Sequence, residues 1–176
     1  IDSSQGTLHS TLDSLPEEHA LGFVLACIQS SSISHGFEAT IRSEIDSTKG
    51  LGTSAAVTVA MTTGLQRLKG YSLDPGRIVT QSRETIRNVQ GRGSGCDAAA
   101  SAYGAIVLID PEPFRVQPIH TFAPFFMAYA GYKTPTPEVI RIVERHREKS
   151  PTFFKQVFSA METCVTETTE AIRLGD

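Results

Sequence analysis

The 176 residues are one domain's worth of chain, enough to bury a hydrophobic core but few for a complete two-domain enzyme. The formal net charge is -3, and Lys and Arg are spread along the chain, which is not typical of a nucleic-acid-binding surface. No apolar run approaches the roughly 20 residues needed to cross a bilayer, and residues 1–6 lack a signal-peptide pattern. We therefore expect a soluble, cytoplasmic protein without nucleic-acid or membrane partners.

The cysteines Cys27, Cys96 and Cys164 are odd in number, far apart and without CxxC spacing. This pattern predicts neither a disulfide framework nor a zinc site. We expect all three to be buried free thiols. The histidines are scattered without metal-ligand spacing, so none receives a role.

The first half of the chain predicts a helix, a strand and a second helix. Apolar residues at helical spacing predict a helix over 16–28, and strict alternation predicts a half-buried strand over 37–45. A glycine-rich segment at 46–54 follows the strand. Small apolar residues then predict a helix over 55–68 that stops at Gly70.

The second half begins with a helix from Pro75 to about Asn88, with Asp74 as its N-cap. A second glycine-rich loop at 90–97 and a short alanine-rich helix at 98–103 follow. Strands are then predicted over 104–109, 114–119 and 125–129. Two final helices are expected from 136 to about 149 and from 151 to about 174. We expect the apolar stripe of the last helix, residues 153–165, to lie in the core.

The strongest chemical signal is the glycine-rich loop that links the predicted strand to the helix after it. Glycines let the backbone approach a polyanion, and the free N–H groups and dipole of a helix start attract phosphate oxygens. The loop lacks the Gly-Lys-Ser/Thr of a Walker A motif and the spacing of the dinucleotide fingerprint. On glycines alone, a turn that tightens the junction is as good an interpretation as a phosphate site.

Residues 50–55, Gly-Leu-Gly-Thr-Ser-Ala, resemble the phosphate-binding motif of the GHMP kinases, Pro-x-x-x-Gly-Leu-Gly-Ser-Ser-Ala. Thr53 stands at the place of the first Ser, and Asp46 stands at the place of the Pro. The resemblance implies that Ser54 coordinates Mg²⁺. It also implies that the phosphates of ATP bind the backbone amides of Gly50, Leu51, Gly52, Thr53, Ser54 and Ala55.

The second loop, Gly-Ser-Gly-Cys-Asp at 93–97, resembles the Ser-Gly-x-Asp segment of the same family. The resemblance implies that Asp97 faces the substrate hydroxyl as catalytic base, with Ser94 and Gly95 beside the substrate. Alternatively, Asp97 is the N-cap of the helix predicted over 98–103, which for an isolated Asp is the commoner role. The presence of both loops in the family's order favours the catalytic interpretation.

Other site residues rest on the resemblance alone. In mevalonate-kinase-like members a Glu before the second loop binds magnesium, and Glu84 is the nearby acidic residue. It stands about two residues too far upstream for that role, so a solvated helix carboxylate is the better interpretation. Lys133, Thr134 and Thr136 resemble a segment that lines the acceptor pocket. A lysine and hydroxyls at a helix start suit an anionic substrate, but Thr136 can also be a simple cap.

The resemblance implies an α+β fold. Residues 1–122 would form the ATP-binding N-terminal domain, like domain 2 of ribosomal protein S5, and residues 123–176 the beginning of a ferredoxin-like C-terminal domain. The Pro-Gly/Ala-Lys-like segment that opens the family pattern and the glycine-rich loop that closes it are missing. We therefore expect the chain to be truncated at both ends.

The implied function is transfer of the γ-phosphoryl group of ATP to a hydroxyl or phosphate of a small metabolite, as in the mevalonate and phosphomevalonate kinases of isoprenoid biosynthesis. Three alternatives stay open: a sugar kinase, an ATP-dependent diphosphomevalonate decarboxylase, and a non-catalytic ligand-binding relative. The acceptor itself is not predicted, and a homodimer is left open.

Overall fold

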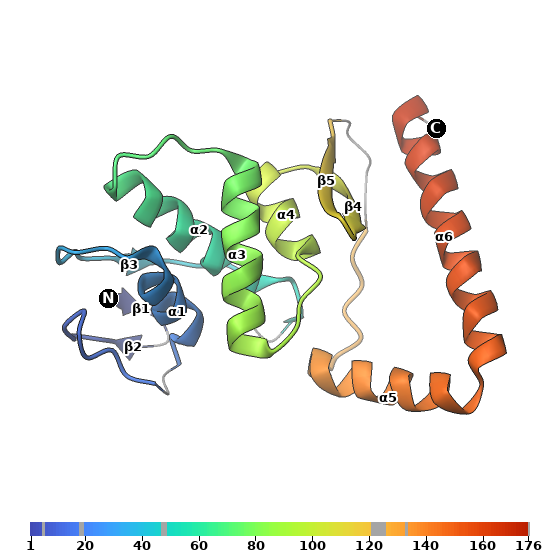
Figure 1. Ribbon diagram of the computed structural model, residues 1–176, viewed down its shortest axis with the longest axis horizontal. Coiled ribbons are helices and arrows are strands. Elements are labelled where there is room, and N and C mark those ends of the chain that lie inside the picture. Colours follow the sequence, from blue (N-terminus) through green and yellow to red (C-terminus); the bar gives the residue numbers. More distant parts are fainter. Residues whose placement is uncertain (5, 18–19, 47–48, 121–125, 133, 176) are drawn as a thin grey trace. The chain divides into compact units, whose positions relative to one another are not determined.

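The computed structural model describes residues 1–176 except 5, 18–19, 47–48, 121–125, 133 and 176. The chain divides into two compact units, Ile1–Pro118 and Ile119–Asp176. The described residues form helices and short strands, so the predicted α+β class is confirmed (Figure 1).

The described residues of the first unit form the helices and strands that carry the glycine-rich loops; the last strand extends one residue past Pro118. In chain order these are β1 (Asp2–Ser3), β2 (Gly6–Thr7), α1 (Gly22–Ser31), β3 (Thr40–Ile41), α2 (Thr53–Leu68), α3 (Pro75–Gln90), α4 (Cys96–Tyr103), β4 (Ile106–Pro111) and β5 (Phe114–Ile119). Strand β1 pairs antiparallel with β2 and parallel with β3, and β4 pairs with β5. The strand predicted over 37–45 is therefore wrong in extent, because only Thr40 and Ile41 find a partner.

The main core of this unit lies where α1, α2 and α3 pack together. Helix α1 begins at Gly22, later than the predicted start at residue 16. Its buried side chains join those of α2 in one apolar cluster: Leu21, Val24, Leu25, Cys27, Ile28, Ile33, Met61 and Leu65. Helix α3 contacts both α2 and α4 (Figure 1), so it links this core to the helix that carries the second loop.

The ends of α2 and α3 follow from local sequence. Helix α2 starts at the glycine-rich loop and is followed by Gly70, whose φ of 75° is the left-handed geometry that glycine favours after a helix. Helix α3 has Pro75 at its first position, and the Asp74 side chain accepts a hydrogen bond of 2.7 Å from the Arg77 N–H. The predicted helices are thus confirmed here, although α3 runs on to Gln90.

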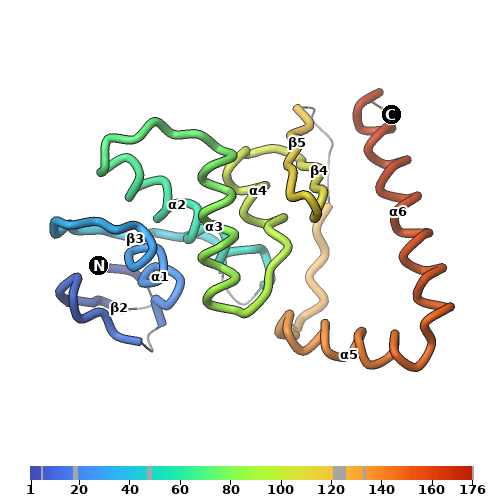
Figure 2. Tube along the Cα trace, viewed as in Figure 1, coloured from blue at the N-terminus to red at the C-terminus, as the bar shows by residue number. Residues whose placement is uncertain are grey.

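The second unit contains α5 (Thr136–Lys149) and α6 (Pro151–Leu174), as predicted. Residues 126–129, which Figure 2 traces on the way to α5, form no strand, so that part of the predicted strand is wrong. Several apolar side chains expected in the core are exposed instead, among them Phe153, Phe158 and Met161. None of the helices in the described ranges is both long and apolar enough to span a membrane.

The three cysteines differ in environment, which corrects the prediction that all are buried. Cys27 is buried on α1, whereas Cys96 and Cys164 are exposed. The Cys27 thiol donates a hydrogen bond of 3.6 Å to the Thr58 carbonyl oxygen. Burial raises the pKa of Cys27 from its ordinary value of 9.0 to about 11, and the hydrogen bond with Thr62 lowers it in part.

This difference predicts the pattern of thiol reactivity. At pH 8 a thiol reagent should modify Cys96 and Cys164 quickly and Cys27 only after unfolding, because burial blocks access and keeps the thiol protonated. Chromogenic thiol titration, with and without denaturant, measures how many thiols react in the folded and in the unfolded protein. Rapid reaction of Cys27 in the native protein would contradict the packing of α1.

The pKa of Cys27 is raised in the folded state, so the protein also depends on pH for its free energy of unfolding. The contribution of the neutral thiol is complete below pH 9 and is lost as the pH rises toward 11.

Candidate functional site

The first loop ends in a left-handed turn that only glycine adopts without strain. Gly50 has φ of 73° and Gly52 has φ of 68°, and Gly52 is the N-cap of α2. Each L-residue other than glycine would cost roughly 1–2 kcal/mol in this conformation. The two glycines of the motif are therefore required by the backbone, and they leave the loop without side chains where it meets the helix.

The start of α2 has the properties of an anion-binding site. The first intrahelical bond runs from the Ala56 N–H to the Gly52 carbonyl oxygen, at 3.0 Å. The N–H groups of Thr53, Ser54 and Ala55 precede that bond, and no side chain in the described ranges caps them. The first turn also contains no acidic residue. Free donors and the positive end of the helix dipole thus combine at one point.

The second loop begins α4 in a similar way. Gly95 is the N-cap, with φ of 93°, and Asp97 lies within the first helical turn. The alternative that Asp97 is the N-cap is therefore wrong. Asp97 is exposed, and among the described residues its carboxyl group forms no hydrogen bond or ion pair. The side chain is available to an external group.

The two loops lie against each other. A methyl group placed on the Gly52 Cα would lie 3.4 Å from both Cβ and Cγ of Asp97 and 3.5 Å from its Oδ2 atom. The Asp97 side chain therefore sits in van der Waals range of the turn that opens α2. A carboxyl group and a set of free backbone N–H groups thus share one small region of the first unit.

Small residues just inside the two helices explain this contact. Ala55 follows Ser54 on α2 and is 2% exposed, and Ala98 follows Asp97 on α4 and is 0% exposed. Both belong to one buried cluster with Val59 and Ile78. Because alanine has only a methyl side chain, the starts of α2 and α4 can approach closely, which is consistent with the contact between the Gly52 turn and Asp97.

The other predicted residues are placed as follows. Ser54 is half-buried at the start of α2. Ser94 is exposed, and its hydroxyl accepts a hydrogen bond of 3.3 Å from the Cys96 N–H. Thr134 and Thr136 belong to the second unit, where the N-cap of α5 is Pro135, so the alternative of Thr136 as cap is wrong. Lys133 lies outside the described residues.

Glu84 is on helix α3 and lies away from the Gly52–Asp97 contact. It lines a cavity of about 130 Å³ that also includes Gln66 and Lys69. Two positions along the helix, Ile86 packs on the cluster of Ala55 and Ala98, so Glu84 emerges on the opposite face of α3. The metal role of Glu84 stays a prediction that this geometry does not support.

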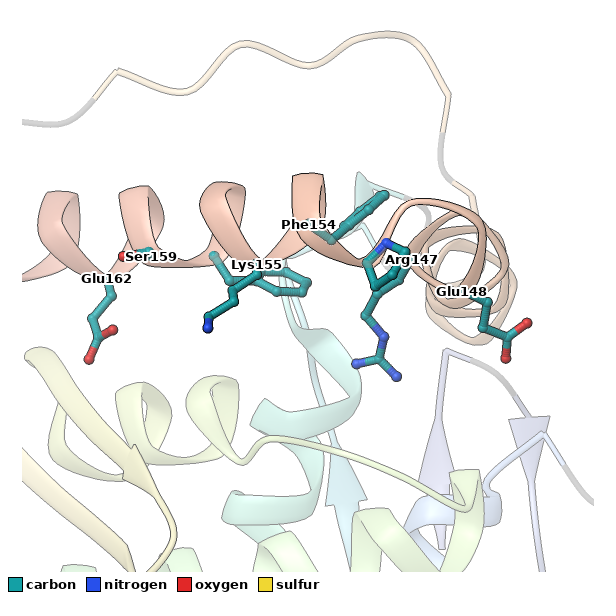
Figure 3. Close-up of a pocket in the computed structure, with 8 residues that line it drawn as sticks. Arg147, Glu148, Phe154, Lys155, Ser159 and Glu162 are labelled. Atoms are coloured by element: carbon teal, nitrogen blue, oxygen red, sulfur yellow. The ribbon is translucent and has the colours of Figure 1, made fainter.

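A second cavity lies in the other unit. It is a groove of about 640 Å³ at the corner between α5 and α6, and its lining includes Arg147, Glu148, Phe154 and Lys155 (Figure 3). Of the predicted site residues that the structure describes, none lines this groove. The candidate site is therefore the Gly52–Asp97 region rather than the groove.

The family of the chain follows from comparison with known proteins. The family model for the N-terminal domain of the GHMP kinases matches residues 18–105, half of the chain, and this span includes both glycine-rich loops. The chain belongs to the GHMP kinase family.

Several mevalonate kinases are similar to this chain. The mevalonate kinase of Pyrococcus furiosus is 31% identical over 137 residues, which cover 78% of this chain and 41% of that protein. The mevalonate kinase of Archaeoglobus fulgidus is 32% identical over 135 residues, covering 77% and 46%. That of Methanothermobacter thermautotrophicus is 25% identical over 169 residues, covering 92% and 56%. The chain thus spans about half the length of these relatives or less.

Proposed function

We propose that this chain forms the ATP-binding part of a kinase that transfers a phosphoryl group to a small hydroxylated metabolite. The observation that carries the proposal is the contact of Asp97 with the Gly52 turn. Phosphoryl transfer needs an acid–base group beside the transferred phosphate, and its catalysis is mostly positioning and charge neutralisation. A helix start with free N–H groups and an adjacent carboxyl group, both without a partner among the described residues, would supply these two functions.

The N–H groups of residues 53–55 would hold the β- and γ-phosphates of ATP. These donors are fixed by the helix, so binding costs little reorganisation. Gly52 presents no side chain, so the phosphates can approach the backbone. In this arrangement the γ-phosphate would lie at the start of α2, beside the Asp97 side chain.

Asp97 would act on the acceptor. Its carboxyl group would accept the proton of the substrate hydroxyl as the hydroxyl oxygen attacks the γ-phosphorus. The bond from that phosphorus to the β,γ-bridging oxygen would then break, and ADP would leave. The carboxyl group has no competing partner in the described part of the chain, which suits this role.

The donor set fits a magnesium ion held largely by phosphate oxygens. Among the described residues no three His, Cys, Asp or Glu side chains gather into a site that could hold a metal by themselves. Mg²⁺ in kinases is commonly held by one or two protein groups together with the phosphates, and here the protein group would be the Ser54 hydroxyl. When bound, the ion would neutralise charge on the transferred phosphate.

Replacing Ser54 by Ala should raise the magnesium concentration for half-maximal activity by about tenfold, the factor that corresponds to roughly 1.4 kcal/mol. The reason is the loss of one oxygen ligand, while the helix is preserved because alanine is a good helix former. Activity measured against magnesium concentration checks this. Ser101→Ala, the same exchange at an exposed position of α4, is the control and should have no effect. An unchanged magnesium requirement in Ser54→Ala would remove Ser54 from the metal site.

The proposed acceptor is mevalonate or a close relative of it, because the similar proteins are named mevalonate kinases. ADP release by the complete gene product, measured with mevalonate, phosphomevalonate and galactose, would identify the acceptor. Carbon dioxide release from diphosphomevalonate would instead indicate a decarboxylase. The absence of ADP formation with every acceptor would favour a ligand-binding relative.

The finer fold assignment is also a proposal. We propose that the first unit has the fold of domain 2 of ribosomal protein S5 and that the second unit begins a ferredoxin-like domain. The family match and the α+β class support this proposal. Lys133, Thr134 and Thr136 would contribute to the acceptor pocket through that second domain.

A further inference from the structure

One charged side chain on α3 contacts the second loop at the residues just before Asp97. The Arg83 Nε–H donates a hydrogen bond of 3.2 Å to the carbonyl oxygen of Ser94. The Arg83 guanidinium carbon also lies 4.2 Å from the centroid of the Phe114 ring on β5. The side chain therefore joins three elements of the first unit: α3, the loop and β5.

Gly95 is packed directly on this pair. A methyl group placed on its Cα would lie 2.9 Å from Cδ of Arg83, 3.2 Å from Cγ of Arg83 and 3.2 Å from Cζ of Phe114. Only glycine fits at position 95, because both its positive φ and this close packing exclude any larger residue. Arg83 and Phe114 thus form the surface on which the N-cap of α4 rests.

This contact lies at the point where α4 begins. The Ser94 carbonyl is held by Arg83, and the Ser94 hydroxyl accepts from the Cys96 N–H, so the residues on both sides of Gly95 are fixed. Asp97 is two residues beyond the N-cap, and its side chain contacts the Gly52 turn. A shift of Ser94 or Gly95 would therefore move the Asp97 carboxyl group relative to the start of α2.

We propose that Arg83 is a positioning residue that holds the second loop, and through it Asp97, in register with the phosphate-binding turn. This inference rests on the proposed kinase function. Arg83 touches neither phosphate nor acceptor in this arrangement. Its planar guanidinium stacks on Phe114 while Nε donates to the loop, a combination that a lysine ammonium reproduces only in part.

The test compares Arg83→Met with Arg83→Lys in the complete gene product. Arg83→Met should lower kcat by about 10- to 100-fold, since a displacement of about 1 Å can cost 10²-fold, while the Kd for ATP stays within about threefold. Arg83→Lys should recover part of kcat. Arg77→Met is the matched control, because Arg77 is on the same helix and its guanidinium carbon lies 5.9 Å from the centroid of the Tyr71 ring, away from the loop.

A double mutant separates positioning from a general structural effect. If Arg83 acts through Asp97, Arg83→Met should change kcat little further in an Asp97→Asn background. A full additional loss in that background, or wild-type kcat in Arg83→Met, would overturn the inference. Phe114→Leu tests the same contact independently if Arg83→Met does not fold, and wild-type kcat in that variant would also count against it. Failure of the kinase proposal itself would appear differently, as absent ADP formation in the wild type or an unaffected Asp97→Asn variant.

Discussion

Replacing Asp97 by Asn in the complete gene product should lower kcat by about 10²- to 10⁴-fold, the usual contribution of a general base. Asn has nearly the same shape, so its contact with the Gly52 turn should persist, but its amide cannot accept the acceptor proton. The affinity for ATP should stay nearly unchanged, because the phosphates bind to backbone groups of α2. Steady-state ADP release gives kcat, and calorimetry gives the Kd for ATP.

Asp74→Asn provides the matched control for this exchange. Asp74 also stands at a helix start, where it caps α3 through the Arg77 N–H, and Asn caps equally well. This variant should retain both kcat and stability. Because Gly95 rather than Asp97 is the N-cap of α4, loss of kcat in Asp97→Asn cannot be ascribed to a lost cap. An unchanged kcat would remove Asp97 from the mechanism.

The sequence predicted the two loops but could not show that they meet. The motifs at 50–55 and 93–97 were recognisable because glycines with small hydroxyl and acidic neighbours are a local pattern. Their contact depends on Ala55 and Ala98, which are separated along the chain and buried in the same cluster. Two alanines in helices have ordinary helix propensity and no further signal. Long-range packing of this kind is visible only in the structure.

Helices were predicted better than strands for a related reason. The helix caps at Asp74, Pro75 and Pro151 are local signals, and these helices begin as expected. The alternating pattern over 37–45 indicates a strand that needs a partner for its hydrogen bonds, and the structure pairs only Thr40 and Ile41. Similarly, the apolar stripe of α6 predicted burial, but the burial of a helix face depends on which other segments cover it.

Arg83 was missed altogether, and the reason is physical. An arginine in an amphipathic helix is most often a solvated residue, so its type and position carry no signal. Its role follows from Phe114, which lies on a strand far along the chain, and from the Ser94 carbonyl, a backbone group that sequence motifs do not encode. Gly95 is the one sequence feature that points to close packing at this place.

Replacing Gly52 by Ala should have the second large effect, because it places a methyl group between the phosphate-binding turn and Asp97. The new Cβ would lie 3.4 Å from the Asp97 side chain and would cover the bare backbone that the γ-phosphate would approach. We expect kcat/KM to fall by about 10²-fold, the cost of displacing reacting groups by about 1 Å. The positive φ of 68° should also lower the free energy of unfolding by roughly 1–2 kcal/mol.

Gly70→Ala separates the backbone strain of Gly52→Ala from the effect of its methyl group on Asp97. Gly70 has nearly the same φ, 75°, and no other described atom lies within 4 Å of the added methyl group. Thermal unfolding should therefore show similar losses of stability in both variants, since the backbone strain is the same. Steady-state kinetics should show loss of kcat/KM only in Gly52→Ala, since only that methyl group faces Asp97. Equal activity in the two variants would mean that the phosphoryl group is not transferred beside Gly52.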